Sequence, residues 1–421
     1  MGKKNVILAQ SGGPTAVINS SIVGAFDRAV AAPNIDKVYG AKNGIVGVLK
    51  EELIDLTSQR KETMEGLKYT PSSALGSCRY KLDKDISHPA YKRIFEVFDA
   101  HDVGYFFYNG GNDSMDTALK LSQYAKKIGY PINIMGIPKT VDNDLCGTDH
   151  CPGFGSAAKY INTSLVELSY DINVYTSGTV LLFEAMGRHA GWLTASAALS
   201  SLEIYDGTVL IYLPEVAFEI DTFLSQVEEA YRKYNQVLVV VSEGVRDASG
   251  ELLAAQSGKV DQFGHRQLGG VCIQLKHLIE ENITKRAKLI IPDLLQRSAM
   301  HYASKTDIEE AYWMGHKAVD FALEGNTAYM PGIERLSNNP YVWQPKLVPL
   351  EEVANHEKAF PAEWITPSGN FVTQEAIEYV KPLVEGEVSI PTRNGLPRYH
   401  KLDMTMVPKK LEDYVDGCDQ Y

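Results

Sequence analysis

At 421 residues the chain is longer than one average domain, so a pair of lobes is the first expectation. Its 44% hydrophobic and 22% charged residues are typical of a soluble globular protein, and no apolar run approaches the roughly 18 residues that span a bilayer. A net charge of −12 argues against nucleic acid and membranes as partners. Scattered cysteines and the lack of a signal-peptide pattern favour a cytoplasmic protein.

The first predicted unit is a short apolar strand at residues 5–10, which runs into Ser11-Gly12-Gly13 and then into a helix over 17–32. A strand, a glycine turn and a helix in succession can bind an anion, because backbone N–H groups and the helix N-terminus point at the ligand. Tight turns of this kind also occur without any ligand. The turn alone therefore does not predict a site.

Two neighbouring strand–loop units follow a loop at 66–82 and a helix over 91–103. One apolar strand, 104–109, ends in a glycine pair and Asn112-Asp113-Ser114, and a helix over 115–127 follows. The second strand, 132–137, is closed by the sequence PKTVDND at 138–144. Together these loops bring glycines, a lysine and three aspartates to one edge of a parallel sheet, which is where open α/β sheets bind their ligands.

The strand–helix alternation continues almost to residue 325 and predicts a doubly wound, parallel α/β architecture in two lobes. From about residue 326 the composition shifts toward Pro, Glu and Tyr, which indicates a C-terminal extension packed on the lobes. The remaining predicted strands are one within 179–191, which ends in glycine and charge, and others at 207–213, 237–241 and 289–291. The remaining predicted helices are at 192–201, 219–234, 266–281 and 307–325.

The loops carry the groups that phosphoryl transfer needs, which are positive charge, a base and a metal environment. Lys139 and Arg188 could supply the charge, and Asp142 could be the base. Neither a P-loop nor a protein-kinase motif is present. Residues 153–158 fit the dinucleotide pattern G-x-G-x-x-A, but they follow a Cys-Pro loop rather than a strand, so this pattern gives little support to an oxidoreductase.

As a set, the motifs resemble the 6-phosphofructokinase family from residue 5 to about 325. They occur in the family's order and at compatible spacings: SGG with Asn19 at 11–19, GSCR at 76–79, GGNDS at 110–114, PKTVDND at 138–144, EAMGRHAGW at 184–192, SEG at 242–244 and LLQR at 294–297. The resemblance implies two Rossmann-like lobes with the active site in the cleft between them. It assigns 1–153 and about 296–325 to a phosphoryl-donor lobe, 154–295 to a sugar-phosphate lobe and 326–421 to the extension.

Two positions separate the donors that this family uses. Asp113 and Lys139 stand where the ATP-dependent members typically carry glycine, as in the pyrophosphate-dependent branch. The resemblance therefore implies reversible phosphoryl transfer from pyrophosphate to the 1-hydroxyl of fructose 6-phosphate, giving fructose 1,6-bisphosphate and phosphate in glycolysis or gluconeogenesis. An ATP-dependent kinase and a non-catalytic regulatory subunit of the family are the alternatives.

The resemblance also implies roles for individual residues. Asp142 would be the base, Lys139 would stabilise the transition state, and Asp113 would exclude ATP. Asn112 would mark the position of Mg²⁺. The donor would be bound by Gly12, Arg79 and Lys139, and the sugar phosphate by Thr140, Val141, Asp142, Met186, Gly187, Arg188, Glu243 and Arg297.

Some positions depart from the family pattern. Asn112 replaces a metal-binding aspartate, and Leu294 replaces the usual His or Tyr three residues before Arg297. Thr179 and Lys288 stand where many relatives carry arginines that reach across a subunit interface. We expect a homo-oligomer, a dimer or a tetramer, but the sequence does not predict active sites shared between its subunits.

Overall fold

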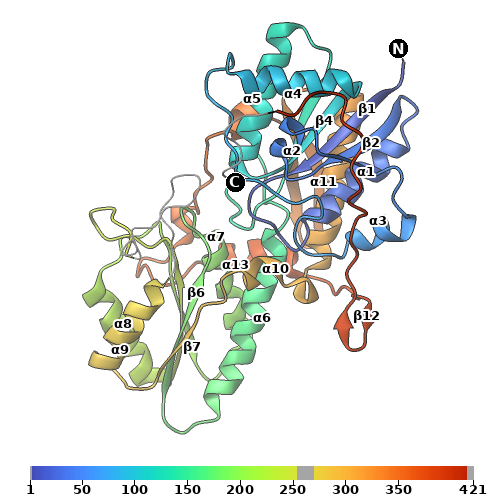
Figure 1. Cartoon of the computed structure of the whole chain (residues 1–421). Coiled ribbons are helices and arrows are strands. Elements are labelled where there is room, and N and C mark those ends of the chain that lie inside the picture. Colours follow the sequence, from blue (N-terminus) through green and yellow to red (C-terminus); the bar gives the residue numbers. More distant parts are fainter. Residues whose placement is uncertain (1, 254–269, 415–421) are drawn as a thin grey trace.

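Two open α/β sheets, one in each lobe, organise the protein (Figure 1). The structure is a computed structural model that describes residues 2–253 and 270–414. The first sheet has seven strands in the order β11-β10-β5-β4-β1-β2-β3. Their bounds are β1 Lys4–Gln10, β2 Ile35–Ala41, β3 Leu53–Asp55, β4 Val103–Gly110, β5 Asn133–Pro138, β10 Tyr329–Asn338 and β11 Tyr341–Pro349.

The centre of this sheet is parallel. β1 pairs with β2 and β4, and β4 pairs with β5, so that Leu8 lies beside Phe107 and Phe107 beside Met135. Nearly every residue of these strands is buried, which is typical of parallel strands covered on both faces. The loops after β1, β4 and β5 consequently leave the sheet side by side at its carboxyl edge.

The second sheet is wholly parallel and has the order β7-β8-β6-β9. The end of β6 lies beside the end of β8, where Ala185 pairs with Ser242. The loops that carry the EAMGR and SEG motifs are therefore neighbours. The strand bounds are β6 Thr179–Ala185, β7 Thr208–Tyr212, β8 Gln236–Ser242 and β9 Ala287–Ile290, and a separate small hairpin pairs β12 Thr392–Arg393 with β13 Leu396–Pro397.

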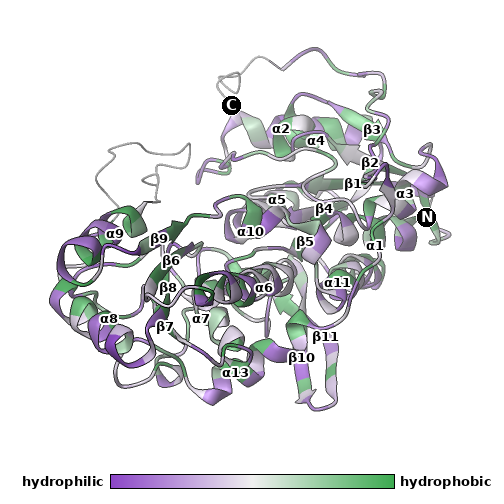
Figure 2. Cartoon of the chain, turned by 90° about the horizontal axis from the view of Figure 1, so that it is seen from below, coloured by the Kyte–Doolittle hydropathy of each residue, from purple (hydrophilic) through white to green (hydrophobic). Residues whose placement is uncertain are grey.

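Helices cover both faces of each sheet, and the strands between them form the apolar interior (Figure 2). The α-helices are α1 Ile18–Val30, α2 Ile45–Leu49, α3 Lys61–Leu67, α4 Pro89–Ala100, α5 Asn112–Ile128, α6 Phe154–Asn173, α7 Trp192–Ser196, α8 Ile220–Tyr234, α9 Val271–Asn282, α10 Leu295–Ser298, α11 Lys305–Leu323, α12 Leu350–Val353 and α13 Gln374–Val380. The 3-10 helices are η1 Ala197–Leu202, η3 Met300–Tyr302, η4 Ala362–Trp364 and η5 Lys381–Val384. The expected two-lobed, doubly wound α/β fold is confirmed. The predicted start of α9, at 266–269, lies outside the described residues.

Helix α11 returns to the first lobe and packs directly on α1. Two glycines allow this close approach: a Cβ at Gly24 would lie 1.9 Å from the Tyr312 carbonyl oxygen, and one at Gly315 would lie 1.8 Å from that of Ser21. Any larger side chain at either position would push the two helices apart. The chain thus crosses from the second lobe back to the first through residues 290–305.

The segment after residue 326 does more than cover the lobes. Its hairpin, β10 and β11, completes the first sheet, while α13 and η5 pack into the core under the second sheet. The sequence did not predict β10 because Pro331 and Gly332 lie inside it, and both residues are unusual in strands. β11 is the edge strand, and β10 pairs with β5 only at Tyr329, so Pro331 lies beyond that pairing, where a missing N–H is tolerated. Among residues 2–253 and 270–414 no helix has the length and apolar character needed to cross a bilayer.

Candidate active site

A cleft of about 1060 Å³ lies where the carboxyl edges of the two sheets face each other. Nearly all residues that the sequence analysis selected line it, and Gly187 lies in the backbone between two lining residues. The predicted residues in the lining are Gly12, Arg79, Asn112, Asp113, Lys139, Thr140, Val141, Asp142, Met186, Arg188, Glu243 and Arg297. Motifs that lie as much as 285 residues apart in the sequence therefore form one site.

The glycine turn after β1 is fastened to the loop that carries Arg79. The Gly12 N–H donates to the Cys78 carbonyl at 3.1 Å, and the Ser77 hydroxyl donates to the Gly12 carbonyl at 2.6 Å. Gly12 has a φ of +75°, and a Cβ there would lie 3.3 Å from the Lys139 ammonium nitrogen. Glycine satisfies both the backbone conformation and the space that the lysine needs.

Lys139 lies at the floor of the cleft and is only 3% exposed. Its ammonium group donates to the Gly13 carbonyl at 2.6 Å, which joins the loop after β5 to the glycine turn. Burial and then the nearby Arg297 lower the pKa of Lys139 to about 8, while Asp142 and Asp144 oppose the shift. The lysine thus places a desolvated positive charge beside the turn.

Asp142 is held by a rigid loop. Its N–H donates to the Thr140 hydroxyl at 3.0 Å. The next residue, Asn143, has a φ of +57°, and its side chain donates to the Tyr379 hydroxyl at 2.9 Å and accepts from the Cys151 N–H at 2.9 Å. Burial, together with the nearby Asp144 and Glu243 carboxylates, raises the pKa of Asp142 to about 7. A carboxyl group with that pKa is suited to act as a general base near neutral pH.

A buried ionic network supports this loop from behind. Arg335 of β10 pairs with Asp149 at 2.7 Å, and His150 pairs with Glu310 of α11 at 2.6 Å. Although burial opposes the charged form of His150, the two carboxylates outweigh it and raise its pKa to about 9. These residues come from three distant segments and belong to no motif, so the sequence alone does not predict their contacts. Only the fold brings them together.

The second lobe supplies the opposite wall of the cleft. The Ser242 hydroxyl donates to the Gly187 carbonyl at 2.6 Å, and the Met186 N–H donates to the Gln296 side chain at 3.0 Å. These bonds fix the loops after β6 and β8 against α10, which carries Arg297. Burial raises the pKa of Glu243, and Arg188 opposes this shift.

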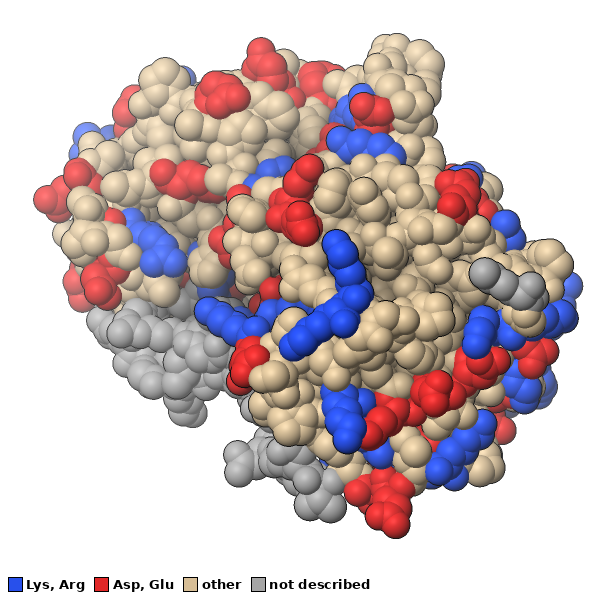
Figure 3. Space-filling model, turned by 90° about the horizontal axis from the view of Figure 1, so that it is seen from above, with Lys and Arg blue, Asp and Glu red and all other residues tan. Residues whose placement is uncertain are grey.

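Arg297 of α10, in the segment that returns to the first lobe, reaches the glycine turn, where a Cβ built on Gly13 would lie 2.7 Å from its guanidinium. Burial and the nearby Arg79 lower the pKa of Arg297. Arginine nonetheless stays charged in proteins. The two guanidinium groups repel each other beside the glycine turn, and an anionic ligand bound there would relieve this repulsion. The surface in Figure 3, by contrast, shows basic and acidic side chains interspersed.

The two residues at the start of α5 are both engaged. Asp113 forms an ion pair with Lys81 at 3.0 Å. The Asn112 amide donates to the carbonyls of Val353 and His356, and its oxygen accepts the Asn355 N–H at 2.6 Å. The structure thus directs the Asn112 side chain toward the segment after α12, which the sequence analysis did not connect with the site.

Two sequence patterns prove to have structural roles. The Glu184 carboxylate of the EAMGR motif accepts the N–H groups of Gly270 and Cys272 at 2.8 and 3.0 Å and so caps α9. The N-terminus of α6, where the dinucleotide pattern lies, is filled by the buried Asp307 carboxylate, which accepts the N–H groups of Gly153 and Ser156. A dinucleotide pyrophosphate would have to displace this carboxylate.

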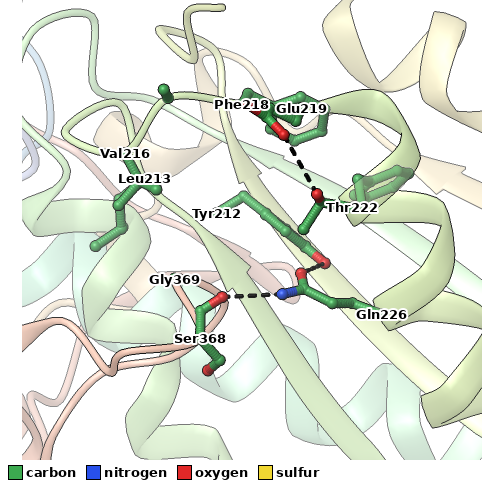
Figure 4. A pocket seen from close by; sticks show the side chains of 11 residues that line it. Tyr212, Leu213, Val216, Phe218, Glu219, Thr222, Gln226, Ser368 and Gly369 are labelled. Atoms are coloured by element: carbon green, nitrogen blue, oxygen red, sulfur yellow. Dashed lines mark hydrogen bonds between the residues drawn. The ribbon is translucent and has the colours of Figure 1, made fainter. Parts of the chain in front are cut away.

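A smaller cavity of about 130 Å³ lies apart from the cleft, at the carboxyl end of β7 (Figure 4). None of the predicted site residues lines it. Its polar side chains bind one another: the Tyr212 hydroxyl donates to Gln226 at 2.9 Å, and Gln226 donates to the Ser368 carbonyl at 2.9 Å. The cavity therefore lacks the converging polar groups of the cleft.

The described residues contain no cluster of three or more His, Cys, Asp or Glu side chains that could hold a metal ion by themselves. The cleft does contain carboxylates without full neutralisation. Burial, with Glu357 adding to it, raises the pKa of Asp144, next to Asp142. Oxygen ligands and unneutralised negative charge fit Mg²⁺, which usually takes one or two carboxylates and completes its shell with substrate phosphates and water.

Comparison with known proteins agrees with this geometry. Residues 5–322 match the phosphofructokinase family. Pyrophosphate–fructose 6-phosphate 1-phosphotransferases of Halomonas elongata and Methylococcus capsulatus are 46% and 48% identical to this chain, covering 98% of it and 100% and 99% of their own lengths. A crystal structure of the pyrophosphate-dependent phosphofructokinase of Nitrosospira multiformis superposes with a TM-score of 0.90 at 44% identity, covering 98% of this chain and all of that one. The chain belongs to the phosphofructokinase family.

Proposed function

We propose that this chain is a phosphotransferase that moves a phosphoryl group from pyrophosphate to the 1-hydroxyl of fructose 6-phosphate. The observation that carries the proposal is the arrangement of Lys139 and Asp142 at the floor of the cleft. Lys139 presents a desolvated positive charge to the glycine turn, and Asp142 is a carboxylate whose pKa is raised to about 7. Relatives that cover nearly the whole chain carry the name of this activity.

The reaction uses these two groups in one step. The Asp142 carboxylate takes the proton of the sugar 1-hydroxyl as its oxygen attacks the nearer phosphorus of pyrophosphate. The bond from that phosphorus to the bridging oxygen breaks, and inorganic phosphate leaves with the bonding electrons. Lys139 stabilises the charge that spreads over the transferred group. The products are fructose 1,6-bisphosphate and phosphate, and the proton passes from Asp142 to water.

The walls of the cleft hold the two substrates. The glycine turn at Gly12 and Gly13, with Arg79, receives the second phosphate of the donor through N–H groups other than that of Gly12, which donates to the Cys78 carbonyl. The guanidinium groups of Arg188 and Arg297 face the phosphate group of the sugar. Glu243 accepts hydrogen bonds from the sugar hydroxyl groups. The remaining contacts with the sugar phosphate are made by backbone and apolar groups of four residues, Thr140, Val141, Met186 and Gly187.

Asp113 selects pyrophosphate over ATP. Its carboxylate stands at the N-terminus of α5, where helix dipole and N–H groups would otherwise receive a further phosphate. A negative charge at that position repels the α-phosphate of a nucleotide. The salt bridge with Lys81 fixes the carboxylate there.

Mg²⁺ fits the donor side of the site. Asp144 and the Asn112 amide oxygen would hold it together with oxygens of pyrophosphate. When bound, the ion neutralises charge on the donor. The Asn112 oxygen already accepts one N–H, so its part in this set is small.

The first lobe, residues 1–153 with 296–325, binds the donor, and the second, 154–295, binds the sugar phosphate. The extension that begins at residue 326 packs on the two lobes. The protein acts in the cytoplasm as a homo-oligomer.

The test measures formation of fructose 1,6-bisphosphate with Mg²⁺, comparing pyrophosphate and ATP on one preparation. Turnover with pyrophosphate alone is the expected result. Turnover with ATP alone would show an ATP-dependent kinase, and no turnover with either donor would favour a regulatory subunit. Asp113→Gly should then raise the use of ATP relative to pyrophosphate.

A further inference from the structure

Residues 353–358, here called the strap, connect the two lobes across one end of the cleft. Asn355 and Glu357 of the strap line the cleft together with the residues of the glycine turn. The strap lies outside residues 5–322, the part of the chain that matches the family. Its contacts show what it does in this protein.

On the first lobe the strap is tied to the start of α5. The Asn112 side chain makes three hydrogen bonds with it, two to the carbonyls of Val353 and His356 and one from the N–H of Asn355. The Asn355 side chain donates to Asp116, one turn along the same helix, at 3.0 Å. The strap thus covers the end of α5 at which helix N–H groups would otherwise attract an anion.

The strap is also tied to the catalytic loop and to the second lobe. The Lys358 N–H donates to the Asp144 carbonyl at 2.7 Å, and the Trp192 indole donates to the Lys358 carbonyl at 2.8 Å. Glu357 pairs with His189, beside Arg188, at 2.9 Å. The position of the strap is therefore set from three sides.

These contacts explain why residue 112 is an asparagine. Two of its three partners are carbonyl oxygens, which need a donor, and the third is an N–H, which needs an acceptor. An aspartate has no donor when ionised, so it would meet the two carbonyls with like partial charges. Only an amide satisfies all three partners at this length of side chain.

We propose that the strap, positioned by Asn112, limits the length of the phosphoryl donor. This inference rests on the proposed function. Pyrophosphate needs room for two phosphates, next to Lys139 and at the glycine turn. A third phosphate would extend toward α5, where the strap occupies the helix end and the carboxylates of Asp113 and Glu357 repel it. Asn112 is a positioning residue, and Asn355 forms the wall.

The test compares inorganic tripolyphosphate with pyrophosphate as donor. Asn355→Gly removes the wall side chain and keeps the backbone, because Asn355 has a φ of +63° that glycine adopts freely. The ratio of kcat/KM for pyrophosphate to kcat/KM for tripolyphosphate should fall about tenfold, the effect of one repulsive or lost polar contact. The KM for fructose 6-phosphate should stay within twofold.

Asn112→Asp should lower the same ratio by releasing the strap, and Glu352→Gln is the matched control. Glu352 is exposed, lies just before the strap and does not line the cleft, so its variant should keep the wild-type ratio. Calorimetric titration of the same variants with each anion gives the ratio of the two dissociation constants and needs no turnover. An Asn355→Gly variant that folds, binds pyrophosphate and discriminates as the wild type does would overturn the inference. If the wild-type protein itself showed no turnover with pyrophosphate, the proposed function would be refuted instead.

Discussion

The charged side chains on the two walls of the cleft differ in how far their pKa values are shifted. On the first lobe, at the floor of the cleft, the pKa values of Lys139 and Asp142 move toward neutrality, to about 8 and about 7. On the opposite wall the guanidinium groups of Arg188 and Arg297 remain charged at any physiological pH, although burial also raises the pKa of Glu243 there. Groups whose protonation can change at neutral pH are suited to chemistry, and permanent charges are suited to holding a phosphate. In the proposed function, the first wall therefore carries the reaction and the opposite wall binds the sugar phosphate.

Replacing Asp142 should have the largest effect. Asp142→Asn keeps the shape of the side chain but cannot take a proton, so kcat should fall about 10³-fold, within the range for a lost general base. The KM values should change little, because the loop is fixed by Thr140 and Asn143 rather than by the carboxylate. Steady-state kinetics with pyrophosphate measure both.

Asp293→Asn is the control for this variant. Asp293 lines the same cleft and has a φ of +44°, which asparagine also accepts. Its kcat should stay within a few-fold of the wild type. Equal losses in the two variants would mean that the cleft needs negative charge in general and not a base at position 142.

Replacing Lys139 should have the next largest effect. Lys139→Met retains the length and the buried surface but removes the charge and the hydrogen bond to the Gly13 carbonyl. We expect kcat/KM for pyrophosphate to fall about 10²- to 10³-fold, as for the loss of one group that stabilises a transition state. If the KM for fructose 6-phosphate rose by the same factor, Lys139 would also bind the sugar phosphate, and the proposed separation of the reaction and sugar binding between the two walls would be wrong. A thermal unfolding curve shows whether the variant is folded.

The sequence predicted the loops that meet at the carboxyl edges because each motif directly follows a strand, and parallel strands end at one edge. The positions of Gly12 and Lys139 relative to those strands were therefore enough to place them at one edge. Arg188 follows a strand of the other sheet, and the family resemblance placed it in the same site. The sequence did not predict the strap or the pair of Arg335 with Asp149, since these contacts join residues more than 180 positions apart and follow no local period. It also suggested that Asn112 is a weakened metal ligand, whereas its three hydrogen bonds depend on a segment more than 240 residues later.

Removing a guanidinium from the second lobe should have a smaller and more selective effect. For Arg188→Leu we expect the KM for fructose 6-phosphate to rise about 10- to 100-fold, which corresponds to the loss of a hydrogen bond between charged groups. The KM for pyrophosphate should change much less. Titrating each substrate with the other at saturation measures both constants. A larger effect on pyrophosphate than on the sugar would place Arg188 on the donor side.

The dependence on pH should be the mildest effect and the most specific to the first wall. Because its pKa is raised to about 7, Asp142 is a carboxylate above that pH and loses its function as a base as the pH falls through 7. Lys139 is charged below about 8 and loses its charge as the pH rises through that value. The kcat/KM for pyrophosphate should therefore be highest between pH 7 and 8 and fall about tenfold for each pH unit beyond either limit. The residual activity of Lys139→Met should lack the alkaline decline and that of Asp142→Asn the acidic one. An acidic decline that persists in Asp142→Asn would belong to the titration of pyrophosphate or of another group, and the reaction could then no longer be assigned to Asp142.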